Sequence, residues 1–132
     1  MALQAADKDF FFEHGYIHVG RVLTAERLQS LRDEIDRIVA DASGISDHDG
    51  VYDLEASHRA DAPRVRRIKT PHMHFPLFED LARDPAISDP VAVLIGDDIR
   101  LYGGKINIKA AGYGAPVEWH QDWAFYPHTN DD

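Results

Sequence analysis

Residues 24–42 carry the longest helical pattern in the sequence, and this pattern most restricts how the chain can fold. Thr24 is a good N-cap residue, and Glu26 lies in the first turn, where the helix dipole favours an acidic side chain. A helix with one apolar stripe is stable when that stripe packs against another element. We therefore predict a packing element ending near Ala42 and remote from any chemistry. The apolar residues at helical spacing are Leu28, Leu31, Ile35, Ile38 and Val39.

Shorter patterns predict the order of the remaining elements. Helices are expected at residues 7–14, 77–83 and from 85 or 88 to 95, and strands at residues 16–19, 64–70 and 117–124. Residues 98–109 are expected to form one strand or a pair of strands broken at Gly103-Gly104. Helices thus dominate the first part of the chain, and strands gather towards its end. We predict a single α+β domain over residues 1–132, with a sheet that is only beginning where the chain stops.

The composition excludes several classes of function. The chain has 23 acidic and 14 basic residues and a formal charge of -9, which argues against binding to nucleic acid or to an anionic membrane surface. It has no cysteine, and therefore no disulfide, thiolate zinc site or cysteine nucleophile. Its start lacks the pattern of a signal peptide, and no apolar run approaches the ~18 residues of a membrane span. These features predict a cytoplasmic protein.

Two histidine-containing or acidic segments suggest metal sites at first sight. Residues 43–63 are rich in acidic side chains, but their spacing does not match a calcium-binding EF-hand loop. A solvated, mobile loop is the simpler interpretation, and a lid over a site remains open. His72 and His74 lie between Pro71 and Phe75-Pro76, which favours a turn with half-exposed histidines over a metal-binding pair.

The strongest chemical signal is His120-Gln121-Asp122, which is bracketed by Trp119 and Trp123. On a strand, residues i and i+2 point to the same face, about 6.6 Å apart along the strand. The pair can then supply two corners of the 2-His-1-carboxylate arrangement that holds non-haem Fe(II). A His-x-Asp pair is expected about once by chance in this composition. The two flanking tryptophans strengthen the interpretation of this pair as a metal site, because an apolar wall limits the access of solvent to a metal.

A polar strand face lies just upstream of this pair. In residues 105–109 the isoleucines point one way, and Lys105, Asn107 and Lys109 point the other way. A solvated face is the simpler interpretation. The alternative is a face that turns into a barrel and contacts an anionic ligand there.

The sequence resembles the phytanoyl-CoA dioxygenase family over nearly its whole length. The resemblance rests on residues 106–109 and 117–132, including the His-Gln-Asp-Trp run, and on Phe11-Phe12-Glu13-His14-Gly15-Tyr16 near the start. It implies a double-stranded β-helix, or jelly roll, that uses Fe(II), O2 and 2-oxoglutarate to hydroxylate a small molecule. It also implies roles for five residues: iron ligation by His120 and Asp122, and proximity to 2-oxoglutarate for Lys109, Asn107 and Lys69.

The sequence departs from the family in length. Members of the family are about twice as long, because a closed jelly roll needs about eight strands. The distal histidine ligand and the basic clamp for 2-oxoglutarate lack counterparts here, and His128 is the single histidine after the motif. We therefore keep two alternatives: a non-catalytic fragment, or a module whose sheet is completed by a second polypeptide. A cupin-like protein with a different metal is a third interpretation.

Overall fold

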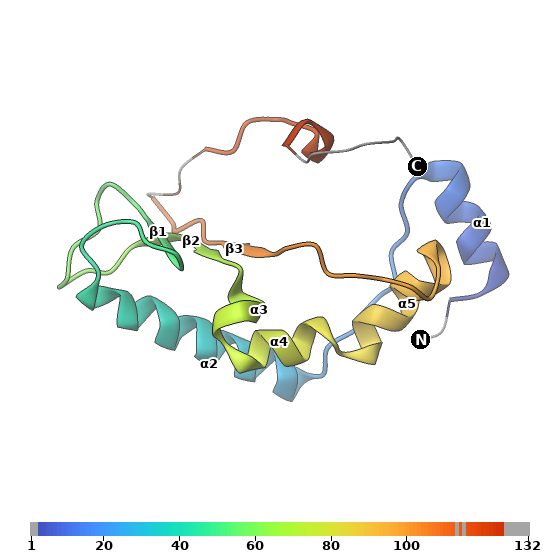
Figure 1. The fold of residues 1–132 in the computed structure, drawn as a ribbon, viewed down its shortest axis with the longest axis horizontal. Coiled ribbons are helices and arrows are strands. Elements are labelled where there is room, and N and C mark those ends of the chain that lie inside the picture. Colours follow the sequence, from blue (N-terminus) through green and yellow to red (C-terminus); the bar gives the residue numbers. More distant parts are fainter. Residues whose placement is uncertain (1–2, 113, 115, 126–132) are drawn as a thin grey trace.

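The computed structural model describes residues 3–112, 114 and 116–125, and it shows an α+β arrangement of helices around a small antiparallel sheet (Figure 1). The coarse prediction of an α+β fold is confirmed. In chain order the elements are α1 (Ala5–His14), α2 (Ala25–Asp41), η1 (Ala42–Gly44), β1 (Tyr52–Leu54), β2 (Val65–Lys69), α3 (Pro71–His74), α4 (Pro76–Ala82), α5 (Pro85–Ile95), β3 (Lys105–Asn107) and η2 (Asp122–Phe125).

The helices agree best with the sequence patterns. The Thr24 hydroxyl accepts a hydrogen bond from the Arg27 backbone N–H, so the predicted N-cap of α2 is confirmed. Helix α1 ends at Gly15, whose positive φ of 77° is the left-handed conformation that glycine tolerates best. Among the described residues, none of the helices is both long enough and apolar enough to cross a bilayer.

Strand β2 lies in the centre of the sheet and is antiparallel to both β1 and β3. Asp53, Arg67 and Asn107 are in register across the three strands. The register then shifts, because Leu54 pairs with Val65 and leaves Arg66 as an extra residue on β2. The sequence predicts strict alternation here, with Val65 and Ile68 on opposite faces. That prediction is wrong, because such a bulge reverses the alternation.

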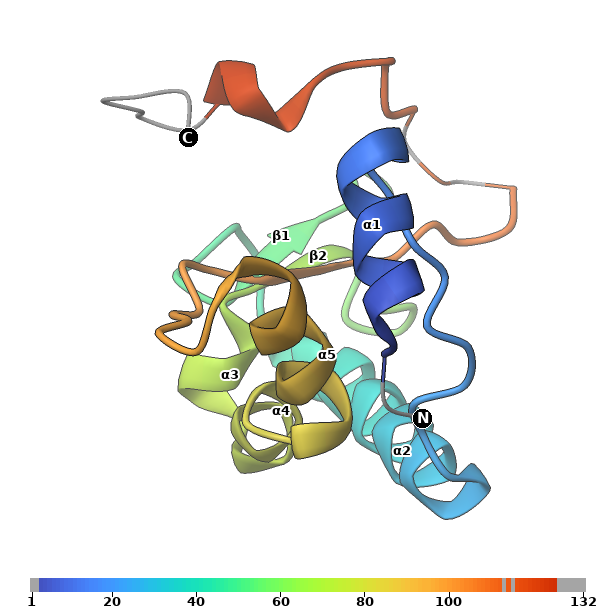
Figure 2. The ribbon, with the colours of Figure 1, turned by 90° about the vertical axis from the view of Figure 1, so that its right-hand side faces the viewer.

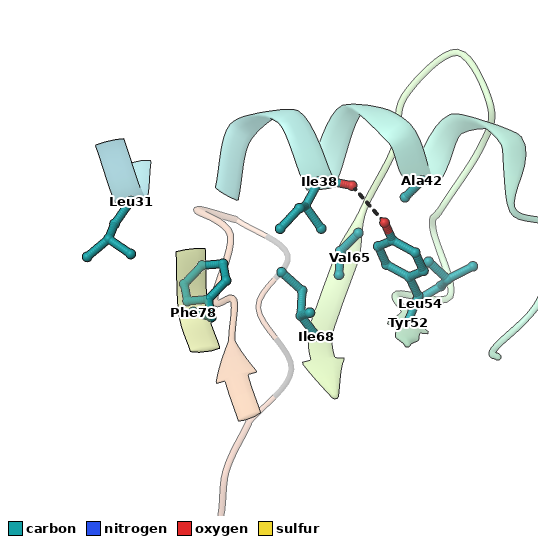
Figure 3. Packing of buried hydrophobic residues seen from close by; sticks show 8 residues of the cluster. All are labelled: Leu31, Ile38, Ala42, Tyr52, Leu54, Val65, Ile68 and Phe78. Atoms are coloured by element: carbon teal, nitrogen blue, oxygen red, sulfur yellow. Dashed lines mark hydrogen bonds between the residues drawn. The ribbon is translucent and has the colours of Figure 1, made fainter. Parts of the chain in front are cut away.

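One face of this sheet forms the core with α2 and α4 (Figures 1 and 3). Ile38 of α2 and Ile68 of β2 are completely buried, and the Tyr52 hydroxyl donates a hydrogen bond of 3.3 Å to the Ile38 carbonyl. Burial of Tyr52 is the main reason why the pKa of its hydroxyl is raised. Ile106 and Ile108 pack against the same core, as their alternation predicts. The opposite, polar face of the sheet is therefore left for the residues after β3.

Several parts of the chain differ from the sequence prediction. The strand expected at residues 98–109 is limited to β3, Lys105–Asn107. Residues 16–19 do not form the expected strand, and Tyr16 is exposed, because an extended segment needs a partner to become a strand. Residues 72–74 belong to the short helix α3 and not to a turn.

The segment between α2 and β2 is held by more contacts than a solvated loop would have. It contains β1, and the Nδ1 atoms of His48 and His58 accept hydrogen bonds from the backbone N–H groups of Leu54 and Arg64. Nε2 of His58 also donates to the Ile45 carbonyl, at 2.8 Å. These histidines thus act as structural links within the loop, and the sequence alone offered no signal for them.

Asp49 is expected to stabilise the start of β1. Its Oδ1 accepts the backbone N–H groups of Val51 and Tyr52 at 2.7 and 2.6 Å, and chiefly these bonds lower the pKa of the carboxyl. We expect Asp49→Ala to lower the free energy of unfolding by about 1 kcal/mol at pH 7, a modest effect because the site is open to water.

The lowered pKa of Asp49 predicts how its contribution to stability changes with pH. A carboxyl whose pKa is lowered by folding stabilises the protein above its unfolded pKa of about 3.9, and this contribution is lost as the pH falls through the folded value. Urea unfolding of wild type and Asp49→Ala should therefore differ at pH 7, and the difference should shrink as the pH falls below about 3.9. A difference that is unchanged at pH 3 would contradict the assigned role of the carboxylate.

Candidate functional site

The segment that carries the His-x-Asp motif lies across the polar face of the sheet, on the side opposite α2 and α4 (Figures 1 and 2). The sequence predicts a strand at residues 117–124. That prediction is wrong: residues 116–121 are irregular, and η2 begins at Asp122. No other described strand pairs with this segment, so its backbone lacks the ladder that would keep it extended.

His120 and Asp122 nevertheless approach each other closely. The distance from His120 Nε2 to Asp122 Oδ1 is 3.2 Å. Asp122 is the first residue of the short helix η2, and His120 precedes it in irregular backbone. The two groups are close, as expected, although the two residues do not lie on one strand face.

The orientation of the His120 ring is fixed by a backbone contact. Nδ1 lies 2.7 Å from the Glu118 carbonyl oxygen, so the ring donates its hydrogen through Nδ1. In the neutral ring, Nε2 then presents a lone pair towards Asp122. The Phe125 ring lies edge-on to the imidazole, with ring centres 5.6 Å apart. A carbonyl that holds the distal nitrogen is the usual way in which a metal-binding histidine is oriented.

The spacing of these two atoms fits a shared cation. Two ligands at about 2.1 Å from one ion, at a right angle, lie about 3 Å apart. A nitrogen lone pair and a carboxylate oxygen repel each other at 3.2 Å unless a proton or a metal ion lies between them. Within residues 3–112, 114 and 116–125, no group of three His, Cys, Asp or Glu side chains is close enough to hold a metal, so this part of the chain supplies two ligands. His128 lies outside the described residues.

A cavity of about 630 Å³ separates this segment from the sheet. Arg66, Arg67, Lys105 and Asn107 line it on the side of the sheet, and residues 116–118, 120, 122 and 125 line it on the other side. The polar face of β3 thus turns towards the His120–Asp122 pair. Lys105 and Asn107 are exposed and also line the cavity, so the structure agrees with both the solvated surface and the face that contacts a ligand.

Contacts on the sheet distinguish the basic side chains from one another. Arg67 donates to Asn107 Oδ1 at 3.1 Å and lies 3.4 Å from Asp53. Lys69 pairs with the same Asp53 at 3.2 Å and also donates to the Asp49 carbonyl. Lys69 is therefore engaged at the β1 edge and does not line the cavity. Lys109 follows β3, is exposed, and does not line the cavity either. Of the three residues expected near 2-oxoglutarate, Asn107 alone lies on the cavity wall.

The expected apolar wall of tryptophans is absent on one side. Trp119 is fully exposed and lies in an irregular segment. The prediction that it shields the site is wrong for this part of the chain. Conversely, Arg66 and the orienting carbonyl of Glu118 were missed by sequence reasoning. The position of Arg66 depends on the bulge, and that of Glu118 on an irregular backbone, so neither had a sequence signal.

Comparison with known proteins relates this arrangement to a family. The family model described as "Phytanoyl-CoA dioxygenase (PhyH)" matches residues 11–132. A "Probable alpha-ketoglutarate-dependent hypophosphite dioxygenase" from Stutzerimonas stutzeri is 36% identical over 122 residues, which are 92% of this chain and 42% of that protein. An "Ectoine dioxygenase" from Sphingopyxis alaskensis is 25% identical over 121 residues, or 92% of this chain and 37% of that protein.

The fold has a solved counterpart. A crystal structure of EctD from S. alaskensis with bound Fe matches with a TM-score of 0.77 at 22% sequence identity, covering 92% of this chain and 41% of that one. The chain thus spans less than half the length of these relatives. The family model covers nearly the whole chain, including the His120–Asp122 segment. The chain belongs to the phytanoyl-CoA dioxygenase family.

Proposed function

We propose that this chain is part of an Fe(II)- and 2-oxoglutarate-dependent dioxygenase that hydroxylates a small molecule. Membership of the family and the names of the relatives support this reaction class. The observation that carries the proposal is the pair of donor atoms, His120 Nε2 and Asp122 Oδ1, held 3.2 Å apart at the wall of a cavity. The carbonyl of Glu118 supports it further by leaving the lone pair of Nε2 available for a metal.

Each residue has a defined task in this proposal. His120 and Asp122 would hold Fe(II), which supplies the oxidation of a C–H bond with O2 and 2-oxoglutarate. Asn107 is suited to donate its amide N–H to a carboxylate of 2-oxoglutarate, because Arg67 already occupies its Oδ1 atom. Lys109 and Lys69 remain predictions for this cosubstrate. The sheet face would exclude bulk water from the reacting groups.

The remaining parts of the centre are proposed to come from outside the described residues. We propose that the three-stranded sheet is a portion of a double-stranded β-helix and that the third iron ligand lies outside residues 3–112, 114 and 116–125. The likeness to the iron-containing EctD structure, at a TM-score of 0.77, supports the fold. The absence of a third ligand in the described part of the chain supports the second statement.

The test is stoichiometric turnover by the complete gene product. With Fe(II) present, consumption of O2 should match the formation of succinate, and a chelator should abolish both. Metal analysis of the purified protein separates iron from a different metal in a cupin-like protein. Absence of succinate formation, with iron and 2-oxoglutarate both supplied and a panel of small substrates, would contradict the proposed function.

A second candidate is a non-catalytic module that pairs with another polypeptide. It is favoured by the exposed apolar side chains of the motif segment, Val117, Trp119 and Phe125, and by the two outer strands β1 and β3. Light scattering on the purified protein distinguishes the two candidates. A monomer that turns over 2-oxoglutarate would exclude the pairing module, and a stable assembly without turnover would favour it.

A further inference from the structure

The cavity beside the His120–Asp122 pair is locally basic in an acidic protein. It is lined by three basic side chains, Arg66, Arg67 and Lys105, and by two acidic ones, Glu118 and Asp122. The whole chain, in contrast, carries a formal charge of -9. A generally basic surface therefore does not explain this grouping. The basic side chains of the wall therefore make the cavity a place to which a small anion is attracted.

The contacts divide the cations near the cavity into two groups. Arg67 and Lys69 share the carboxylate of Asp53, and Arg67 also bonds to Asn107. Within the part of the chain that the structure describes, no hydrogen bond or ion pair involves the ammonium of Lys105 or the guanidinium of Arg66. The backbone of Lys105 is held in the sheet, where it pairs with Lys69 in the β2–β3 ladder, and its side chain is exposed. An ammonium without a carboxylate partner is available to an anionic ligand.

Lys105 and Asn107 offer two separate positions on the cavity floor. They lie two residues apart on the same face of β3, which corresponds to about 6.6 Å along the strand. Arg66 lies towards the other end of the floor, since its carbonyl bonds to the N–H of Ile108. A ligand at Asn107 is therefore near the two arginines, and Lys105 remains for a different group.

The distribution of charge points in the same direction. Asp53 pairs with Arg67, so the cations of the wall without a carboxylate partner among the described residues are Arg66 and Lys105. A carboxylate of the cosubstrate near Asn107 and Arg66 would leave Lys105 for one negative charge on a second ligand.

From these contacts we infer that Lys105 selects the substrate by binding an anionic group on it, so that the substrate is a small monoanion such as a carboxylate or an oxyanion. This inference rests on the proposed function, because it assigns the cosubstrate to the end of the floor near Asn107. Lys105 is then a specificity-determining residue, while iron binding depends on His120 and Asp122.

The experiment measures binding without turnover, on the complete gene product loaded with Mn(II) and 2-oxoglutarate in the absence of O2. The probes are propionate, the neutral propionamide of similar shape, and hypophosphite. We expect at least one of the two anions to bind about tenfold or more tightly than the amide. Lys105→Gln should weaken the binding of that anion by about 10- to 100-fold, the usual cost of losing a charge-assisted hydrogen bond. Lys105→Arg should restore much of it.

Two variants control for charge and position. Lys8→Gln removes the same charge from α1, where the ammonium lies over the Phe12 ring, and should leave anion binding unchanged. Arg66→Gln removes a charge from the other end of the floor and should weaken the binding of the anion less than Lys105→Gln does. Equal melting temperatures without ligand exclude unfolding as the cause of any loss.

Several outcomes would overturn the inference. Equal losses of anion affinity in Lys105→Gln and Arg66→Gln would show that the anion responds to the overall positive potential of the cavity and makes no specific contact with Lys105. A loss of 2-oxoglutarate affinity in Lys105→Gln would assign this side chain to the cosubstrate. If Mn(II) and 2-oxoglutarate bind but neither anion binds better than propionamide, the inference is wrong while the proposed function stands. If neither Mn(II) nor 2-oxoglutarate binds, the proposed function is wrong and the inference falls with it.

Discussion

Asp122→Ala and His120→Ala are each expected to lower the affinity for Fe(II) by more than about 100-fold and to abolish the formation of succinate. Replacing residues that merely orient a metal ligand already costs about 10- to 100-fold in affinity, and each of these changes removes a ligand itself. The loss should be severe for either residue, because Nε2 and Oδ1 are 3.2 Å apart and one donor alone holds the ion poorly. Titration with Fe(II) under anaerobic conditions measures the affinity directly.

Matched replacements elsewhere separate metal binding from general damage. His14→Ala and Asp61→Ala remove the same side chains from exposed positions, His14 on α1 and Asp61 in an ion pair with Arg59. Both should retain the iron stoichiometry and turnover of wild type. Asp122→Asn keeps the shape of the side chain and removes its charge, so it should also bind iron poorly. Full iron occupancy in both His120→Ala and Asp122→Ala would refute the assignment.

Ile68→Ala is expected to lower the free energy of unfolding by about 2–5 kcal/mol. Ile68 is completely buried at the centre of β2, where it packs against the residues from α2 and α4 shown in Figure 3. Removal of its outer carbons loses burial and leaves a cavity that the surrounding sheet and helices cannot fill. This amount is a large fraction of the total stability of a domain, about 5–15 kcal/mol, so a fall of roughly 10 °C in the melting temperature is expected.

An isoleucine on the surface provides the control. Ile95 at the end of α5 is 67% exposed, and Ile95→Ala should change the free energy of unfolding by less than about 0.5 kcal/mol. Chemical denaturation of the three proteins gives both values. If Ile68→Ala were as stable as Ile95→Ala, the packing of β2 on α2 and α4 would be wrong. Because Arg67 and Lys69 flank Ile68, the same replacement should also weaken ligand binding at the cavity.

The agreement between sequence and structure is best where a signal is local. The N-cap at Thr24, the stripe of α2 and the glycine that ends α1 all depend on residues within a few positions of one another. The alternation of residues 105–109 correctly separated the partly buried isoleucines, which pack against the core, from Lys105 and Asn107, for the same reason. The motif at His120 and Asp122 also lies within three residues, so its two donors could be named from the sequence.

Features that depend on distant partners could not be read in this way. Residues 16–19 and 117–124 have the composition of strands, but a strand exists through hydrogen bonds to a neighbour, and the described structure provides none for them. β1 was missed because its three residues are identified by pairing with β2 and not by their own pattern. The bulge at Arg66 likewise requires two strands at once.

By itself, then, the sequence determined α1, α2, α4, α5 and the polar face of β3, and it singled out the His120–Asp122 pair, because each is encoded by residue types at short spacing. The tertiary structure decided that His120 and Asp122 approach each other outside a strand, that Glu118 orients the ring, and that Lys69 pairs with Asp53 away from the cavity. The first two outcomes depend on an irregular backbone path that has no periodic pattern in the sequence. The third depends on a contact between segments far apart in the chain.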